Sequence, residues 1–326
     1  MEIFNSELQL QANKTGFHAD ILEKVWRLLS ILDKINKDSY LKQRLALKGG
    51  TALNLFFFNI PRLSVDIDLN YVGAFDTEEM LTDRPVLEAA LEEVFRKEGM
   101  KIQRIPKKHA GGKWTLRYPS VISGFKNLEV DLNFMFRVPL WEIREKSSFL
   151  LGQQQIHKIS LFNEYELAAG KLIAFFSRRA SRDLFDTHHL LTHLPLDLQQ
   201  LRFTFFLYGA MGSLDLRNIS LDILDFEPQE LRMKLITMLR RNSIKTPSTW
   251  MSWPQLLLTE CKEKLSFIFP FRENEREFLN ALYEHGQIEP ALLTQDEQLI
   301  SKIKSLPLLR WRASLALKNL QNKALT

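Results

Sequence analysis

Apolar and polar residues alternate along two segments in the first half of the chain. From Leu63 to Tyr71 every second residue is apolar, which places Asp66 and Asp68 together on the opposite side. The segment from Leu128 to Phe136 alternates in the same way and carries Asp131 on its polar side. Each pattern predicts a half-buried strand whose open face carries carboxylates.

The remaining elements follow from the spacing of apolar residues and from the glycines and prolines between them. Helical spacing predicts helices at 18–37, 52–58, 77–97 and 163–179. Shorter stretches predict strands at 100–105 and 113–118, and either a short strand or the end of a helix at 45–47. After about residue 160, nearly every segment has a helical pattern. The sequence therefore predicts an α+β domain with a mixed sheet over residues 1–160, followed by an all-helical domain over residues 161–326.

Composition limits the class of protein. Apolar residues make up 45% and charged residues 25% of the 326 residues, as in an ordinary globular protein. No stretch is long and apolar enough for a membrane helix, and the N-terminus lacks the basic region of a secretory signal. The single cysteine, Cys261, excludes an intrachain disulfide. We therefore expect a cytoplasmic protein without a membrane partner.

The net charge of +5 is concentrated in two segments that contain no acidic residue, 101–126 and 299–326. Such clusters are typical of proteins that bind nucleic acids, although a solvated face without a partner is an equal alternative for each. The candidate RNA contacts in these segments are Lys107, Lys108, Lys113, Arg310 and Arg312.

The strongest candidate for chemistry is Lys48-Gly49-Gly50-Thr51 followed by Asp66-Ile67-Asp68. Glycines before a helix allow backbone N–H groups to approach phosphates closely. Two aspartates at positions i and i+2 of a strand point to the same side, where they can share one Mg²⁺ ion. Asp131 on the second strand is a candidate third metal ligand or a base for a hydroxyl. The alternative is a pair of solvent-facing aspartates on an ordinary strand, which the combination of glycine turn and second acidic strand disfavours.

A second cluster lies in the helical half of the chain. Lys171 interrupts an apolar helical stretch, where it either extends to solvent or reaches into a cleft as a phosphate-binding charge. Downstream, Arg182, Asp183 and Asp186 have the spacing of helical neighbours. Without the first motif, a surface ion-pair ladder is the better explanation of these residues.

Together the two clusters resemble the AbiEii/AbiGii family of nucleotidyltransferase toxins, a branch of the DNA polymerase β-like superfamily, and they are similar to the MenT-type tRNA-modifying toxins. The resemblance rests on KGGTALNLFFFNIPRLSVDIDL at 48–69 and ELAAGKLIAFFSRRASRDLFD at 166–186. It implies a polymerase β-like fold for the first domain.

The resemblance also implies roles for individual residues. The nucleotide-binding residues it implies are Gly49, Gly50, Thr51, Ser64, Lys171, Arg182 and Asp183. Asp66 and Asp68 are the implied metal ligands, joined by Asp131 from the strand pattern, and Lys171 and Asp186 complete the expected catalytic set.

The implied reaction transfers a nucleoside monophosphate from an NTP to an RNA acceptor, with Mg²⁺ or Mn²⁺ as cofactor. The expected acceptor is the 3′ end of tRNA. The resemblance further implies a toxin of a phage-defence toxin–antitoxin system, with an AbiEi-type antitoxin as partner. Two alternatives remain: transfer to a protein or small-molecule hydroxyl, or a nucleotidyltransferase-like binding module without catalysis.

Overall fold

Two compact units form the protein in the computed structural model, which describes residues 4–106, 110–241, 243 and 249–324. The first unit comprises Met1–Arg137, Glu142–Asn163 and Glu227–Gln255, and the second comprises Val138–Trp141, Glu164–Phe226 and Leu256–Thr326. The first unit is therefore discontinuous in sequence. Each unit is a group of residues in contact with one another. Independent domains at 1–160 and 161–326 remain a proposal.

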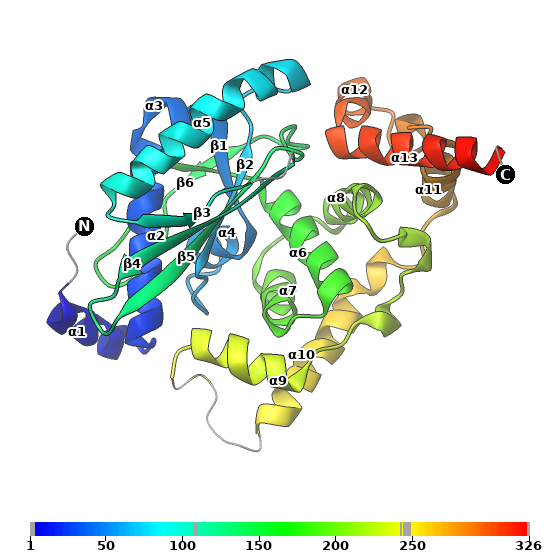
Figure 1. Ribbon diagram of the computed structural model, residues 1–326. Helices are drawn as coiled ribbons and strands as arrows, with labels where there is room; N and C mark the ends of the chain where they lie inside the picture. Colours follow the sequence, from blue (N-terminus) through cyan, green and yellow to red (C-terminus); the bar gives the residue numbers. More distant parts are fainter. Residues whose placement is uncertain (1–3, 107–109, 242, 244–248, 325–326) are drawn as a thin grey trace. The chain divides into compact units, whose positions relative to one another are not determined.

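A mixed sheet of seven strands lies at the centre of the described part of the first unit (Figure 1). Its strand order is β3-β4-β5-β2-β1-β7-β6, with β2 parallel to β5, β1 parallel to β7 and the other pairs antiparallel. The strands are β1 (Leu45–Lys48), β2 (Asp66–Tyr71), β3 (Lys101–Arg104), β4 (Gly111–Pro119), β5 (Phe125–Asn133), β6 (Arg144–Lys146) and β7 (Ile159–Leu161).

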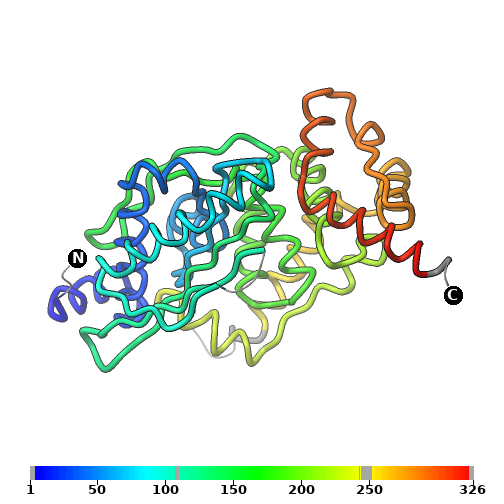
Figure 2. Tube along the Cα trace, turned by 45° about the horizontal axis from the view of Figure 1, so that its top comes forward, coloured from blue at the N-terminus to red at the C-terminus, as the bar shows by residue number. Residues whose placement is uncertain are grey.

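The described part of the first unit also contains helices, several of which contact the sheet. They are α1 (Asn5–Thr15), α2 (Ala19–Lys37), α3 (Ser39–Arg44), α4 (Gly49–Phe56), α5 (Thr77–Lys97) and α9 (Pro228–Glu230), with the short helices η3 (Leu231–Leu235) and η4 (Ile236–Met238). In Figures 1 and 2, α2 and α5 run alongside the sheet. Phe95 of α5 packs edge to face on Trp114 of β4, and the guanidinium of Arg27 on α2 lies 4.5 Å from the ring centre of Tyr118. The apolar face of the sheet is thus covered, which leaves its polar face for chemistry.

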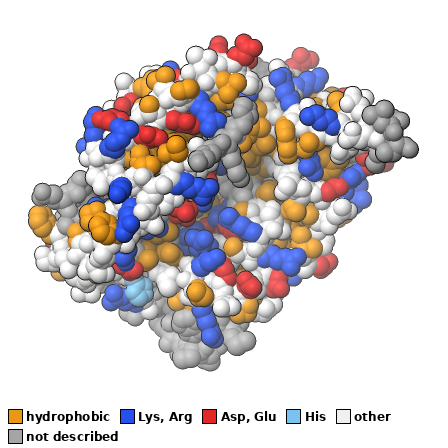
Figure 3. Space-filling view, viewed as in Figure 1, with side chains coloured by type: hydrophobic (Ala, Val, Ile, Leu, Met, Phe, Trp, Pro, Cys, Tyr) orange, Lys and Arg blue, Asp and Glu red, His pale blue; other side chains and the backbone are white. Residues whose placement is uncertain are grey.

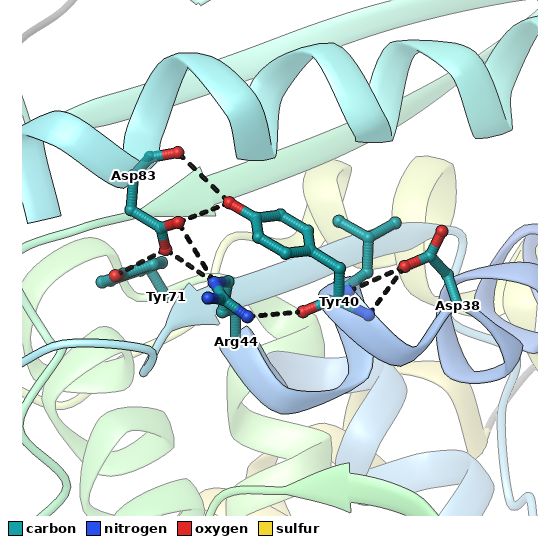
Figure 4. Close-up of polar contacts among 6 residues, drawn as sticks. Asp38, Tyr40, Arg44, Tyr71 and Asp83 are labelled. Atoms are coloured by element: carbon teal, nitrogen blue, oxygen red, sulfur yellow. Dashed lines mark hydrogen bonds and ion pairs between the residues drawn. The ribbon is translucent and has the colours of Figure 1, made fainter.

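A polar cluster joins α3, β2 and α5 at the far end of β2 (Figure 4). The carboxylate of Asp83 accepts hydrogen bonds from the Tyr71 hydroxyl at 2.8 Å, from Nε of Arg44 at 2.8 Å, and from the Tyr40 hydroxyl. The Arg44 guanidinium also lies 3.9 Å from the centre of the Tyr40 ring. These contacts fix α5 against the end of the strand that begins with the two candidate aspartates.

The segment Glu227–Gln255 is held to the rest of the first unit by backbone hydrogen bonds. The N–H of Leu63 donates to the carbonyl of Met238 at 2.8 Å, and the N–H of Arg241 donates to the carbonyl of Gly16 at 2.8 Å. The stretch that leads into β2 is therefore fixed by residues that occur much later in the chain.

The described residues of the second unit contain helices and no strand. Aromatic side chains form much of its core, with Phe176 against Phe205 at 5.6 Å and Phe206 against Phe278 at 5.8 Å between ring centres. Its helices are α6 (Glu164–Arg178), α7 (Ser181–His193), α8 (Leu198–Met211), α10 (Thr249–Leu265, from Leu256 on), α11 (Glu273–His285), α12 (Glu297–Ser305) and α13 (Pro307–Ala324), with η1 (Leu216–Asn218), η2 (Leu221–Ile223), η5 (Ser266–Ile268) and η6 (Pro290–Leu292). A mixed-sheet first part and a helical second part confirm the fold class predicted from the sequence. None of the helices in the described ranges is long and apolar enough to cross a membrane.

Candidate active site

A row of four charged side chains crosses the polar face of the sheet. Lys48 of β1 pairs with Asp68 of β2, Asp68 is in register with Asp131 of β5, and Asp131 pairs with Lys113 of β4. Residues that are paired across neighbouring strands share a face of the sheet. The parallel pairing of β2 with β5 therefore brings together two carboxylates that are far apart in sequence, with a lysine on either side.

Burial over the first four residues of β2 agrees with the alternation of its sequence. Ile67 is 0% and Leu69 is 1% exposed, whereas Asp66 and Asp68 are both partly exposed. In the next row, Asp66 is in register with Glu129 of β5. The two aspartates thus share the polar face, as their i, i+2 spacing predicts.

The glycine turn lies directly against one of these carboxylates. Gly49 has a backbone φ of +73°, and a Cβ atom built on it would lie 2.1 Å from Oδ2 of Asp68. Only glycine fits this position, because any side chain would be strained in its backbone and would overlap the carboxylate. Gly49 is also the first residue of α4, so the turn, the helix N-terminus and Asp68 are adjacent.

Side-chain hydrogen bonds attach α4 to β2 and complete its first turn. Oγ1 of Thr51 donates to the carbonyl oxygen of Asp66 at 2.5 Å, and Nδ2 of Asn54 donates to the carbonyl of Gly50 at 2.9 Å. Thr51 is fully buried. Its hydroxyl is therefore occupied in positioning the strand, and it has no exposed surface to offer a ligand.

The donor set suits a divalent cation that is shared with a phosphate. Among the residues that the structure describes, no three His, Cys, Asp or Glu side chains are grouped closely enough to hold a metal ion by themselves. Mg²⁺ commonly binds through one or two carboxylates and completes its shell with substrate phosphates and water. The adjacent carboxylates of Asp68 and Asp131, with Asp66 on the same face, fit that kind of partial site.

Lys48 belongs to this site, although the sequence analysis named it in the glycine motif without assigning it a role. Burial lowers the pKa of its ammonium group, and the nearby carboxylates of Asp68 and Asp131 act in the opposite direction. Its Nζ lies 5.4 Å from the centre of the Phe136 ring. The signal in the sequence was its place immediately before Gly49, at the end of a strand.

Lys113, a candidate RNA contact at the start of a predicted strand, lies on β4 beside the carboxylates. Its Nζ forms an ion pair with Oε2 of Glu129 at 2.9 Å. The hydrogen bond to Glu129, supported by the charges of Glu129, Asp131 and Asp66, raises the pKa of Lys113. The structure therefore associates Lys113 with the acidic face of the sheet.

The second sequence cluster forms a buried ion network in the second unit. Nζ of Lys171 on α6 lies 2.8 Å from Oδ1 of Asp183 and 2.9 Å from Oδ2 of Asp186, both on α7. The three side chains are 8%, 1% and 0% exposed, respectively. Nε of Arg178, whose side chain is largely exposed, reaches Oδ2 of Asp183 at 2.5 Å. This burial excludes a surface ion-pair ladder as the explanation of Lys171.

The contacts of Asp183 in this network favour the charged form of its carboxyl group. Burial would raise the pKa of Asp183, but the Lys171 ammonium and the Arg178 guanidinium lower it below its usual range.

Arg182 is partly exposed at the start of α7. Ser64 is 8% exposed in the segment before β2, which is in the first unit.

The remaining candidate RNA contacts lie in α13 or outside the described residues. Lys107 and Lys108 are outside the described residues. Arg310 is exposed, and its Nε donates to the carbonyl of Lys304 at 2.8 Å, whereas the guanidinium of Arg312 lies 4.8 Å from the ring centre of Tyr283. Trp311 between them is 47% exposed. Figure 3 shows Lys and Arg side chains interspersed with Asp and Glu on the face it presents.

Comparison with known proteins identifies the fold and the family. The structure of MenT4, a nucleotidyltransferase toxin from Mycobacterium tuberculosis, matches with a TM-score of 0.58 at 17% sequence identity, covering 93% of this chain and 99% of that chain. At this identity the match shows a shared fold. No curated protein matches the chain. The family described as "Nucleotidyl transferase AbiEii toxin, Type IV TA system" matches residues 30–249, which is more than half of the sequence. The chain therefore belongs to the AbiEii family of nucleotidyltransferase toxins.

Proposed function

We propose that this nucleotidyltransferase toxin transfers a nucleoside monophosphate from an NTP to RNA, with the 3′ end of tRNA as acceptor and Mg²⁺ or Mn²⁺ as cofactor. The observation that carries the proposal is the placement of Asp68 in register with Asp131 and against Gly49. A glycine-led helix start beside paired carboxylates is the arrangement that seats a metal-bound triphosphate.

In the reaction, the acceptor hydroxyl oxygen attacks the α-phosphorus, the bond to the β-phosphate oxygen breaks, and pyrophosphate leaves. Asp66 and Asp68 would hold the cation, with Asp131 beside them. The bound cation supplies charge neutralisation at the phosphate. Asp131 would accept the proton of the attacking hydroxyl. Backbone N–H groups of Gly49 and Gly50 would bind phosphate oxygens.

For the second unit, we propose that Lys171 contacts phosphate as a point charge. Its two ion pairs with Asp183 and Asp186 hold the ammonium in one position. Arg182 and Ser64 are proposed as further nucleotide contacts on the basis of the family resemblance, with Thr51 acting through its hydrogen bond to β2.

The acceptor surface is proposed to include the basic residues of α13. Arg310 and Trp311 are exposed next to one another, and no acidic residue occurs from 299 to 326. Cations that neutralise phosphates beside an aromatic ring that stacks on bases are typical of single-stranded RNA binding. Arg312, together with Lys107, Lys108 and Lys113, completes the proposed RNA contacts.

A toxin of this class implies an antitoxin partner, which we propose is of the AbiEi type. We propose a cytoplasmic location, because the proposed RNA acceptor is an intracellular molecule. We propose a role in phage defence on the basis of the family resemblance.

The decisive experiment incubates the protein with total RNA, Mg²⁺ and each α-labelled NTP in turn. Wild type is compared with Asp68→Asn and with the control Asp33→Asn, which removes a charge from an exposed ion pair on α2. We expect label on RNA with wild type and the control, and none with Asp68→Asn. Asp68-dependent label on protein alone would show that the acceptor is a protein and not RNA. The absence of any Asp68-dependent label, with tRNA present, would favour a binding module without catalysis.

A further inference from the structure

The acidic face of the sheet carries its own counter-charges. From β1 to β4 the row reads Lys48, Asp68, Asp131 and Lys113, so two like charges on adjacent strands are flanked by two opposite ones. Like charges directly opposite each other destabilise a sheet, and strands are spaced about 4.8 Å apart. A cation of the protein beside the two aspartates therefore reduces the repulsion between them.

Lys48 is the lysine best placed to compensate both aspartates. Asp68 and Asp131 are the two acidic groups whose charge acts on its ammonium. Lys113 is engaged differently, because its ammonium is bound by Glu129 at 2.9 Å. Lys48 is also more enclosed, since it is only partly exposed at the end of β1, whereas the Lys113 side chain is 46% exposed.

We infer that Lys48 is the internal counter-ion of Asp68 and Asp131, that a divalent cation competes with it for these carboxylates, and that triphosphate oxygens become its partner when the cation enters. This inference rests on the proposed metal site. A divalent cation and an ammonium group repel each other beside the same carboxylates, so entry of the metal weakens the attraction between Lys48 and the two aspartates. A partly enclosed ammonium is stabilised by an anionic partner, and the triphosphate is the anion that arrives with the metal.

The consequence is a coupling between metal and nucleotide. Metal alone weakens the attraction between Lys48 and the aspartates without offering Lys48 a new partner, so it binds weakly. Metal together with triphosphate provides that partner, so the complex binds more tightly. Lys48 acts in this scheme as a positioning residue that links occupancy of the metal site to occupancy of the phosphate site.

The test measures binding of Mn²⁺ alone, and of preformed Mn²⁺–inorganic triphosphate, to the full chain by calorimetry. Lys48→Met removes the charge and keeps most of the side-chain volume, and Lys48→Arg keeps the charge. We expect Lys48→Met to bind Mn²⁺ alone about tenfold or more tightly, since an opposite charge at this range shifts a carboxylate by roughly one to three pKa units. The same variant should bind Mn²⁺–triphosphate more weakly than wild type, and Lys48→Arg should stay close to wild type in both.

A purely structural Lys48 predicts a different result, because loss of local structure lowers both affinities together. That outcome, or an unchanged affinity for Mn²⁺ alone, overturns the inference. Lys101→Met, an exposed lysine of the same sheet, controls for loss of one positive charge. In Lys48→Met, Asp68 and Asp131 have lost their proposed counter-ion. The variant is therefore purified in the presence of Mn²⁺, and the Mn²⁺ is removed by dialysis before binding is measured. Lys113→Met is a second variant at a more exposed position, for which we expect a smaller gain in Mn²⁺ affinity.

Asp68→Asn separates this inference from the proposed function. If Asp68→Asn binds Mn²⁺ as well as wild type does, the proposed metal site is wrong. If Asp68→Asn loses binding but Lys48→Met shows no gain, the metal site stands and the counter-ion role is rejected.

Discussion

Replacing Gly49 by alanine introduces a single methyl group at the most crowded point of the candidate site. The new Cβ would lie 2.1 Å from Oδ2 and 2.9 Å from Cγ of Asp68. Ordinary van der Waals contact begins at 3.4 Å, so the carboxylate has to move by more than 1 Å. The alanine would also adopt a left-handed backbone, with φ of +73° in the native turn.

These two effects differ in size and in what they change. A left-handed backbone costs an alanine about 1–2 kcal/mol of folding stability. Moving the Asp68 side chain off its preferred rotamer adds about 0.5–1.5 kcal/mol. The larger effect is on catalysis, because a misplacement of about 1 Å in a reacting group lowers the rate by roughly 100-fold.

Gly99→Ala separates the backbone effect from the contact with Asp68. Gly99 has a φ of +72°, nearly that of Gly49, but a Cβ there meets no atom within 4 Å. We expect both variants to lose similar backbone stability in urea denaturation, and only Gly49→Ala to lose RNA labelling. Equal labelling by the two variants would refute the argument that Gly49 positions Asp68 for the reaction.

Three further predictions concern residues around the two clusters. Lys171→Met should lower the free energy of unfolding by about 3–5 kcal/mol, since it removes the cation that lies between two buried carboxylates, Asp183 and Asp186; chemical denaturation measures this. Thr51→Val should cost about 1 kcal/mol in the same assay, because it removes the hydrogen bond to the carbonyl of Asp66. Burial raises the pKa of Glu166 from its usual 4.5 to about 7, so the folded state binds the extra proton and stability should fall as pH rises through this interval. Glu166→Gln, followed by thermal unfolding from pH 4.5 to 8, should flatten that part of the profile.

The strands that carry the aspartates were predictable because each has one face buried in the core. Alternation identifies such strands directly, and it placed Asp66 and Asp68 on one side. The predicted start of β2 at Leu63 was wrong, since the strand begins at Asp66. Leu63 instead donates its N–H to Met238, a contact distant in sequence that local periodicity does not contain.

The pairing of the site residues was not predictable from local pattern for the same reason. Strand order places β2 between β1 and β5, and only the register shows that Lys48, Asp68 and Asp131 form one row. For Lys171, the sequence left open both an extension to solvent and a position in a cleft. Its burial was decided by the packing of α6 on α7, which brings Asp183 to its ammonium.

The discontinuous course of the first unit bears on how this toxin is synthesised. Its sheet is encoded before Asn163, but the segment that fixes the approach to the acidic strand ends at Gln255. At typical elongation rates of about 5–20 residues per second, the ribosome needs roughly 5 to 20 seconds to make the intervening stretch. During that interval the nascent chain contains every proposed metal ligand but lacks the segment Glu227–Gln255, which contacts the stretch before β2. The first unit is therefore completed late in translation.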